Sequence, residues 1–304
     1  PFIKRVLRKP ILAWGHGIVL ETSLGRYLGK RTLKYCNRIS TRDAGSTETV
    51  QKLGLSHVAH KQTADCALLL SPAPQETGTK LLENIGIPND SRKLFIITPT
   101  FWHYYHHPGD ILPYQIGECF WLRSRRLQTV HSYLTSLTKL ADALIEQHNA
   151  RVLFLPRYAT KPWKDLALLE DVRIHTKNED DVFVFSTDVH APKEYFSMLR
   201  CCDCLISIAL HDAIVAAAVG TPFVQIPYEQ KGNDFAKAMT MEQWTLPFRD
   251  FLEEQGPAKA AALADDLILN WQNISLQLQS RRETLRQAAR SNIDELANII
   301  ESQQ

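Results

Sequence analysis

The sequence predicts an α/β fold built from doubly wound domains with mainly parallel sheets. Short apolar runs rich in β-branched and aromatic residues, which suit strands buried on both faces, alternate with segments long enough for helices. The chain of 304 residues is 44% hydrophobic and 22% charged, an ordinary globular composition with enough apolar surface for two domains.

The first domain is expected over residues 1–92. Residues 11–70 alternate strand-like pieces, such as ILAWGHGIVL and ISTRD, with the helix candidates LGRYLGKRTLKYCNR and GSTETVQKLGL. This order is typical of βαβ units. The Pro- and Gly-rich breaker SPAPQETG and the polar patch GIPNDSRK follow, so we place the domain boundary near Arg92.

The second domain is expected over residues 93–255. Five apolar runs are predicted strands, namely LFIITPT, ARVLFLPR, DVFVFS, CLISI and PFVQIP, and helix-length segments lie between them. Residues 256–304 are almost entirely helix-forming, and RRETLRQAARSNIDELANII carries apolar residues at three- and four-residue spacing. We therefore expect a C-terminal helical segment that packs against the body and crosses back to the first domain.

Charge, hydropathy and cysteine content limit the classes of function. A net charge of only +2 lacks the basic excess typical of nucleic-acid binding. No apolar stretch approaches the roughly 20 residues that span a bilayer, and the first residues show no signal-peptide core or cleavage site, so neither a membrane span nor a signal peptide is expected. Six cysteines, three of them in RCCDCL, are too few for a disulfide framework, and no second Cys pair completes a zinc site. A cytoplasmic protein without a metal is expected.

One histidine lies where a predicted strand ends and a helix begins. His211 follows CLISI and opens HDAIVAAAVG, a small-residue helix that the Gly-Thr-Pro sequence after Val219 should end. In open parallel sheets, ligands bind beyond the carboxyl ends of strands, where helix N-termini offer N–H groups to anions. His211 is therefore a candidate general acid and base, and the alternative, a histidine that caps its helix, is equally favoured by position alone.

Two ordered stretches resemble the polysaccharide pyruvyl transferase family. LRCCDCLISIALHDAIVAAAVGTPFVQIPYEQKGNDFAKAM is similar to the family's C-terminal signature, and ISTRDAGSTETVQKLGLSHVAHKQTADCALLLSP is similar to its second signature. The resemblance covers most of the chain from Lys9 to Met239. It implies a two-domain GT-B-like fold and transfer of the pyruvyl group of phosphoenolpyruvate onto two hydroxyls of a saccharide as a ketal, without a metal or other cofactor.

The resemblance also suggests roles for individual residues. His211 matches the motif histidine and is the candidate catalytic acid and base, whereas Arg42 of ISTRD matches the motif arginine and is expected to hold the anionic donor. Lys231, after IPYEQ, is a candidate phosphate contact, and a solvated surface lysine is the alternative. Asp43 and Asp65 either orient Arg42 or cap helices.

Further candidates come from their positions after predicted strands. Arg157 ends VLFLPR at a carboxyl edge and is a candidate contact of phosphoenolpyruvate. Trp102, His103 and Tyr104 in TPTFWHYYHHPGD are expected to bind the acceptor saccharide by stacking and hydrogen bonding, unless this aromatic loop packs on its own domain. The charge run RSRR, Arg123 to Arg126, is typical of a solvated helix start, and an anionic lipid surface or a lipid-linked diphosphate is its alternative contact.

Two departures from the family pattern keep other functions open. Ala209 stands where the family usually has Arg before Leu-His, which makes a non-catalytic saccharide-binding relative the first alternative. No counterpart of the family's first strand precedes Phe2, so an incomplete first domain is expected. The second alternative is a nucleotide-sugar glycosyltransferase of GT-B fold, which needs an acidic residue near the end of a second-domain strand. We found none after LISI or PFVQIP.

The expected enzyme thus acts in the cytoplasm, in polysaccharide biosynthesis for the cell envelope. Its expected partners are phosphoenolpyruvate and a saccharide acceptor, and a lipid-linked acceptor would bring it to the inner face of the membrane. Neither nucleic acid nor a transmembrane segment is expected.

Overall fold

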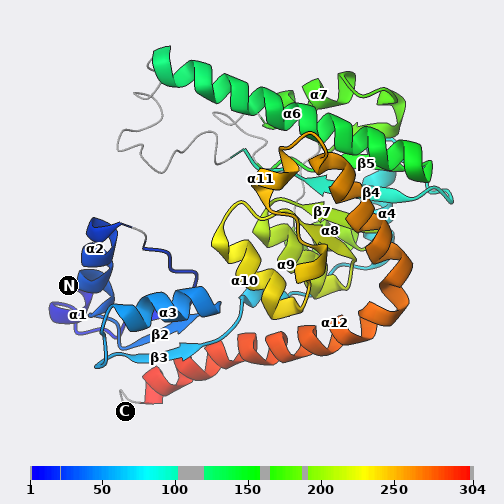
Figure 1. Ribbon diagram of the computed structural model, residues 1–304. Coiled ribbons are helices and arrows are strands. Elements are labelled where there is room, and N and C mark those ends of the chain that lie inside the picture. Colours follow the sequence, from blue (N-terminus) through cyan, green and yellow to red (C-terminus); the bar gives the residue numbers. More distant parts are fainter. Residues whose placement is uncertain (1, 21, 102–119, 158–164, 187–190, 302–304) are drawn as a thin grey trace. The chain divides into compact units, whose positions relative to one another are not determined.

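The computed structural model of the chain describes residues 2–20, 22–101, 120–157, 165–186 and 191–301 (Figure 1). These residues form two compact units. Unit 1 comprises Pro1–Leu70, Glu229–Glu242 and Ile274–Gln304, and unit 2 comprises Ser71–Tyr228 and Gln243–Asn273.

Unit 1 contains a parallel sheet of three strands in the order β1-β2-β3. The strands are β1 (Leu12–His16), β2 (Arg38–Thr41) and β3 (Ala59–Gln62). Its shorter helices are α1 (Phe2–Arg5), α2 (Ser23–Leu33), α3 (Ala44–Lys52), the 3-10 helix η1 (Cys66–Leu69) and α10 (Gln230–Met239). Apolar side chains from β1, β2, α3 and the loop after it form the core between helix and sheet, namely Ala13, Ile39, Val50, Leu53, Leu55 and Val58.

Unit 2 contains a parallel sheet of five strands in the order β6-β5-β4-β7-β8. The strands are β4 (Leu94–Thr98), β5 (Arg151–Phe154), β6 (Val182–Val184), β7 (Cys204–Ser207) and β8 (Phe223–Gln225). All residues of the central strands β4 and β7 are buried, which is why they read as continuous apolar runs.

Helices cover both faces of this sheet. Figure 1 shows α6 (Phe120–His148) and α7 (Asp165–Ile174) together on one side, and α8 (Pro192–Leu199) and α9 (Leu210–Val219) together on the other. The remaining elements are α4 (Gln75–Asn84), η2 (Glu179–Asp181), η3 (Glu242–Trp244), α11 (Phe248–Phe251) and the 46-residue α12 (Gly256–Glu301). None of the helices among the described residues has the length and hydropathy of a membrane span.

The α/β class with parallel sheets and a C-terminal helix is confirmed. The small-residue helix is also confirmed, because α9 buries Ala213 and the three alanines from Ala216 onward, and Gly220 ends it in the left-handed region with φ 82°. Burial of these small side chains lets α9 lie close to the sheet.

The compact units divide after Leu70, whereas the sequence placed the boundary near Arg92. The reason is α4, which packs against α8 and so belongs with the second sheet. Residues 229–242 join unit 1, where α10 contacts α3. The long helix α12 contributes residues before Ile274 to unit 2 and the rest to unit 1.

Candidate functional site

The strand order of unit 2 creates a switch point between β4 and β7. Strands β5 and β6 lie on one side of β4, whereas β7 and β8 lie on the other. In such sheets the connections from the two central strands diverge, and ligands bind at the carboxyl ends of the strands at this point. Thr98 ends β4 and Ser207 ends β7, and the Thr98 hydroxyl donates a hydrogen bond to Ser207 Oγ at 3.1 Å.

The turn from β7 into α9 is held against the end of β4. The N–H groups of Ile208 and Ala209 donate to the Thr98 carbonyl at 3.1 and 3.3 Å, and Ser207 Oγ donates to the Ala209 carbonyl at 2.6 Å. Ala209 is the N-cap residue of α9 and makes no side-chain cap. The first turn of α9 therefore presents N–H groups that suit an anionic ligand.

His211 and Arg157 meet at this edge of the sheet. The exposed His211 lies in the first turn of α9, and the exposed Arg157 follows β5. Arg157 Nη2 lies 3.3 Å from His211 Nδ1. Two of the residues that the sequence singled out separately, about 50 residues apart, are thus neighbours in the structure.

Sequence reasoning missed two polar residues beside this pair. The Tyr195 hydroxyl of α8 donates to Asp212 Oδ1 at 2.7 Å. Burial raises the pKa of Asp212, against the positive charge of Arg157 and the hydrogen bond from Tyr195. Burial also raises the pKa of Tyr195 well above its ordinary value, so its hydroxyl remains a donor.

Asp212 corrects one statement made from the sequence. We found no acidic residue after LISI, yet Asp212 directly follows His211 in the first turn of the next helix. An acidic residue beside the candidate histidine was the available signal. Tyr195 gave no such signal, because its contact with Asp212 depends on the packing of α8 against α9.

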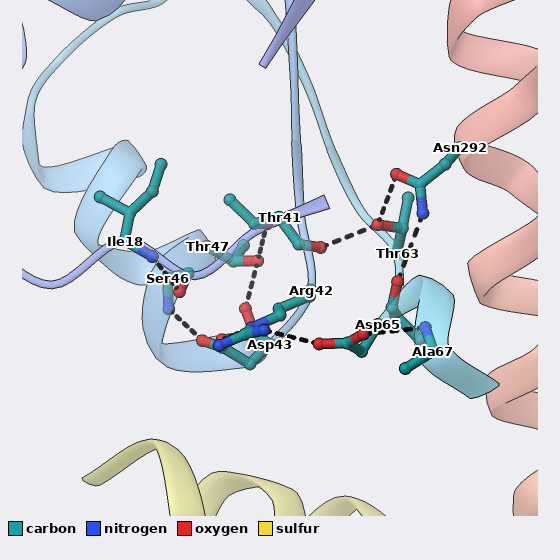
Figure 2. A network of polar contacts seen from close by, with 11 residues as sticks. Ile18, Thr41, Arg42, Asp43, Ser46, Thr47, Thr63, Asp65, Ala67 and Asn292 are labelled. Carbon is teal, nitrogen blue, oxygen red and sulfur yellow. Dashed lines mark hydrogen bonds and ion pairs between the residues drawn. The ribbon is translucent and has the colours of Figure 1, made fainter. Parts of the chain in front are cut away.

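Arg42 lies at the carboxyl end of β2 in unit 1, within a network of polar contacts (Figure 2). Its Nη1 forms an ion pair with Asp65 Oδ2 at 2.6 Å, and its Nε lies 3.9 Å from Asp43 Oδ2. Both acidic residues also cap helices: Asp43 Oδ1 accepts from the Ser46 N–H at 2.6 Å, and Asp65 Oδ1 accepts from the Ala67 N–H at 2.9 Å. Asp43 and Asp65 therefore both orient Arg42 and cap helices, the two roles that the sequence left as alternatives.

The chain after β1 approaches Arg42 closely. A Cβ at Gly17 would lie 2.9 Å from Arg42 Nε, so a side chain at position 17 would displace the guanidinium. The Arg42 N–H also donates to the His16 carbonyl at 3.3 Å. Only 16% of the Arg42 side chain is exposed, so its contacts hold the guanidinium in a fixed position.

The predicted site residues fall in both units. Arg42 and the half-buried Lys231, in the first turn of α10, belong to unit 1, whereas Arg157 and His211 belong to unit 2. The predicted acceptor residues Trp102, His103 and Tyr104 lie outside the described residues, as do the side chains of Arg123 to Arg126.

Of the clustered cysteines, Cys201 and Cys202 lie between α8 and β7, and Cys204 is the first residue of β7. Cys202 and Cys204 are buried and pack as small apolar side chains. Burial raises the pKa of the Cys204 thiol to about 12. Across the part of the chain that the structure describes, no group of three or more His, Cys, Asp or Glu residues could hold a metal ion.

Comparison with solved structures identifies the fold. The chain is similar to HepE (Alr3699) of Anabaena in complex with UDP, with a TM-score of 0.61 at 10% identity over 98% of this chain and 74% of HepE. The HepE complex with UDP-glucose gives a TM-score of 0.59 at the same identity and coverage. Identity this low shows the fold alone, which is the GT-B fold expected from the sequence.

The comparison with curated proteins found no significant match. The model of the polysaccharide pyruvyl transferase family, in contrast, matches residues 1–230, which is most of the chain. This match includes the stretch that resembled the family's second signature, residues 199–230 of the stretch that resembled its C-terminal signature, and the edge of the sheet that carries His211. The chain belongs to the polysaccharide pyruvyl transferase family.

Proposed function

We propose that the chain transfers the pyruvyl group of phosphoenolpyruvate onto two hydroxyls of a saccharide, as a ketal, and releases phosphate. Family membership makes it a transferase that acts on saccharides. The observation that supports the finer proposal is the His211–Arg157 pair at the switch point of unit 2. A proton carrier, a guanidinium and a helix N-terminus together suit a small donor that bears a carboxylate and a phosphate.

The atoms of the proposed reaction balance without a redox partner. The methylene carbon of phosphoenolpyruvate accepts a proton and becomes a methyl group. Its C2 forms bonds to two saccharide oxygens, and the bond from C2 to the phosphate oxygen breaks. The two hydroxyls give up two protons, one of which replaces the proton placed on carbon while the other leaves with phosphate.

His211 is the proposed proton carrier in this sequence of steps. It protonates the methylene carbon as an acid and then accepts a hydroxyl proton as a base, so it returns to its starting state. General acid–base catalysis of this kind contributes about 10²- to 10⁴-fold to a rate.

Cationic side chains and helix N–H groups are proposed to hold the donor. In unit 2 these are the Arg157 guanidinium and the N–H groups in the first turn of α9. Arg42 and Lys231 are proposed as further contacts, and Trp102, His103 and Tyr104 as contacts of the acceptor; these assignments rest on the sequence.

A phosphate-release assay tests the proposal. The protein is incubated with phosphoenolpyruvate and a panel of β-galactosides and amino sugars, and inorganic phosphate is measured. We expect saccharide-dependent release that falls at least about 10²-fold in His211→Asn. His175→Asn, which changes an exposed histidine after α7, is the matched control and should keep the wild-type rate. The absence of release by the wild type over the whole panel would contradict the proposal.

Ligand-induced stabilisation separates the alternatives. Phosphoenolpyruvate is expected to raise the melting temperature, because a ligand that binds only the folded state stabilises it. Stabilisation by UDP or other nucleoside diphosphates but not by phosphoenolpyruvate would favour the glycosyltransferase alternative. Saccharide binding without any phosphate release would favour the non-catalytic relative.

A further inference from the structure

The charges of the chain are unevenly distributed along its sequence. Of its 35 Lys and Arg residues and 33 Asp and Glu residues, eight basic residues and one acidic residue lie within residues 1–35, which gives this segment a net charge of +7. The remaining 27 basic and 32 acidic residues give residues 36–304 a net charge of −5. The small net charge of the whole chain thus conceals a strongly basic segment, which belongs to unit 1.

Helix α2 lies in this segment, and one of its exposed faces is apolar (Figure 1). Every residue of α2 is exposed or half-buried. Leu24, Tyr27 and Leu28 are 66%, 55% and 53% exposed, and their spacing places them on one face of the helix. A surface helix normally turns its apolar face toward the core and its polar face toward solvent, so α2 shows the reverse pattern here.

The opposite face of α2 is the one that contacts the rest of unit 1. A Cβ at Gly29 would lie 2.5 Å from Leu20 Cδ1, so the glycine allows the helix to approach this side chain closely. Leu20 and Leu33 both pack against the core of the unit. At about 3.6 residues per turn, Leu33 lies on the opposite side of the helix from Leu24. The exposed leucines are therefore not needed to attach α2 to the core.

Basic side chains flank the apolar face. Lys30, Arg31 and Lys34 are exposed, and the sequence of α2 contains no acidic residue. Arg31 Nη1 donates to the Tyr27 hydroxyl at 2.7 Å, and the guanidinium carbon lies 5.6 Å from the centre of the Tyr27 ring. An aromatic ring and a positive charge are thus held together beside the exposed leucines.

The chain before α2 has the same character. Its exposed apolar residues are Phe2, Ile3, Val6 and Leu7, and its exposed basic residues are Arg8 and Lys9. Lys4 Nζ donates to Asn37 Oδ1 at 2.6 Å, which places α1 beside the residues that follow α2. The two apolar and basic stretches therefore lie in the same part of unit 1.

A membrane surface that carries anionic lipids accommodates both features. Apolar and aromatic side chains of a surface helix enter the boundary between head groups and acyl chains, while lysine and arginine side chains extend to the lipid phosphates. A protein partner would instead have to bury or pair several positive charges on one short helix, which costs free energy. The combination of apolar exposure with positive charge therefore favours a lipid surface.

We propose that α1 and α2 form a docking surface for a membrane that contains anionic lipids. The inference goes beyond the proposed reaction and does not depend on it, because docking needs no substrate. Docking also brings the protein to the surface at which a lipid-linked saccharide would be presented.

Co-sedimentation of the full chain with vesicles tests the proposal. Vesicles of phosphatidylcholine mixed with phosphatidylglycerol are compared with vesicles of phosphatidylcholine alone. We expect binding to the anionic vesicles only, and we expect it to weaken as the salt concentration rises, because salt screens the attraction between the charges.

Two double variants separate the apolar contribution from the basic one. Leu24→Ser with Leu28→Ser should weaken binding to anionic vesicles at least about tenfold, because it removes two apolar side chains from the lipid boundary. Lys30→Gln with Lys34→Gln should weaken binding about fivefold per residue, the factor expected for each basic residue near an anionic surface. All four positions are exposed, so both variants should fold.

Matched control variants come from exposed positions outside this surface. Leu269→Ser with Leu276→Ser changes two leucines of α12 that are 81% and 73% exposed. Lys52→Gln with Lys237→Gln changes exposed lysines of α3 and α10 and lowers the net charge by the same amount as the α2 variant. Both controls should bind anionic vesicles as the wild type does.

Four results would overturn the proposal. They are a wild type that binds no vesicles, equal binding to both kinds of vesicle, α2 variants that bind as tightly as their controls, and self-association through α2 without vesicle binding. In the last case a second copy of the chain would cover the apolar face. Vesicle binding without any phosphate release would refute the proposed function alone, whereas phosphate release without vesicle binding would refute this inference alone.

Discussion

The Ser40 hydroxyl donates a hydrogen bond of 2.6 Å to Asn292 Oδ1, although the two residues lie 252 positions apart in the sequence. Asn292 also accepts the Thr63 hydroxyl at 3.0 Å, and its amide donates to the Ala289 carbonyl at 3.0 Å. The side chain is fully buried. Within unit 1, Asn292 therefore ties the end of α12 to β2 and to the segment after β3, as Figure 2 shows for Thr63.

Asn292→Leu is expected to lower the free energy of unfolding by about 1–3 kcal/mol, because it removes the shared acceptor of two buried hydroxyls. Urea denaturation followed by circular dichroism measures this. Asn273→Leu replaces an exposed asparagine of the same helix and should change stability little. Equal stabilities of the two variants would show that the buried network contributes nothing.

Gly78 lets α4 lie directly on α8. A Cβ at this position would overlap the backbone carbonyl of Ser197, which cannot rotate away as a flexible side chain can. Gly78→Ala should therefore destabilise the protein by about 1–3 kcal/mol, the cost typical of overpacking, despite the better helix propensity of alanine. Thermal unfolding measures the change. Glu76→Ala, in the first turn of the same helix, is the control, and a Gly78→Ala protein as stable as this control would contradict the close packing.

The Asp90–Arg151 pair predicts how stability changes in acid. Arg151 makes two hydrogen bonds of 2.6 Å to the Asp90 carboxylate. These bonds, together with the Arg92 N–H, lower the pKa of Asp90 from 3.8 to about 2. Because the folded pKa lies below the unfolded one, the carboxylate stabilises the fold above pH 3.8, and this contribution is lost as the pH falls toward about 2.

Asp90→Asn should accordingly be less stable than the wild type above this window, and the difference should shrink within it. Denaturant titrations at a series of pH values measure both curves. Glu83→Gln, which neutralises an exposed residue of α4, should follow the wild-type curve. A constant difference between Asp90→Asn and wild type at every pH would contradict the assignment.

The strands of unit 2 and the place of His211 were predictable because they depend on local patterns. Fully buried strands such as β4 appear as unbroken apolar runs, and a strand followed by a small-residue helix locates the carboxyl edge. The polar contacts beside His211 at that edge were not predictable, because the hydrogen bond from Tyr195 to Asp212 depends on the packing of α8 on α9.

Long-range packing also explains the remaining differences. Nothing in the sequence of α10 indicates that it contacts α3 rather than the sheet it follows. Asn292 looks like any polar residue of an amphipathic helix, and only the fold shows that Ser40 and Thr63 meet it.

Asp212 should cost stability at neutral pH. Burial is the largest influence on this carboxyl group, and it raises the folded pKa above the unfolded value of 3.8. Below the unfolded pKa, the carboxyl group is protonated in both the folded and the unfolded state and costs no stability. The free energy of unfolding falls as the pH rises through the folded pKa. Asp212→Asn carries no such penalty, so it should be more stable than the wild type at about pH 7, and the gain should vanish in acid.

Denaturant titrations across this pH range test the prediction, with Asp180→Asn, a change at an exposed residue of η2, as the control. A gain in stability combined with a weaker hold on phosphoenolpyruvate would mark Asp212 as a residue kept for the site at the expense of the fold. A variant less stable than wild type at neutral pH would contradict the prediction. It would mean that the attraction to Arg157 outweighs burial, and the folded pKa of Asp212 would then lie below 3.8 rather than above it.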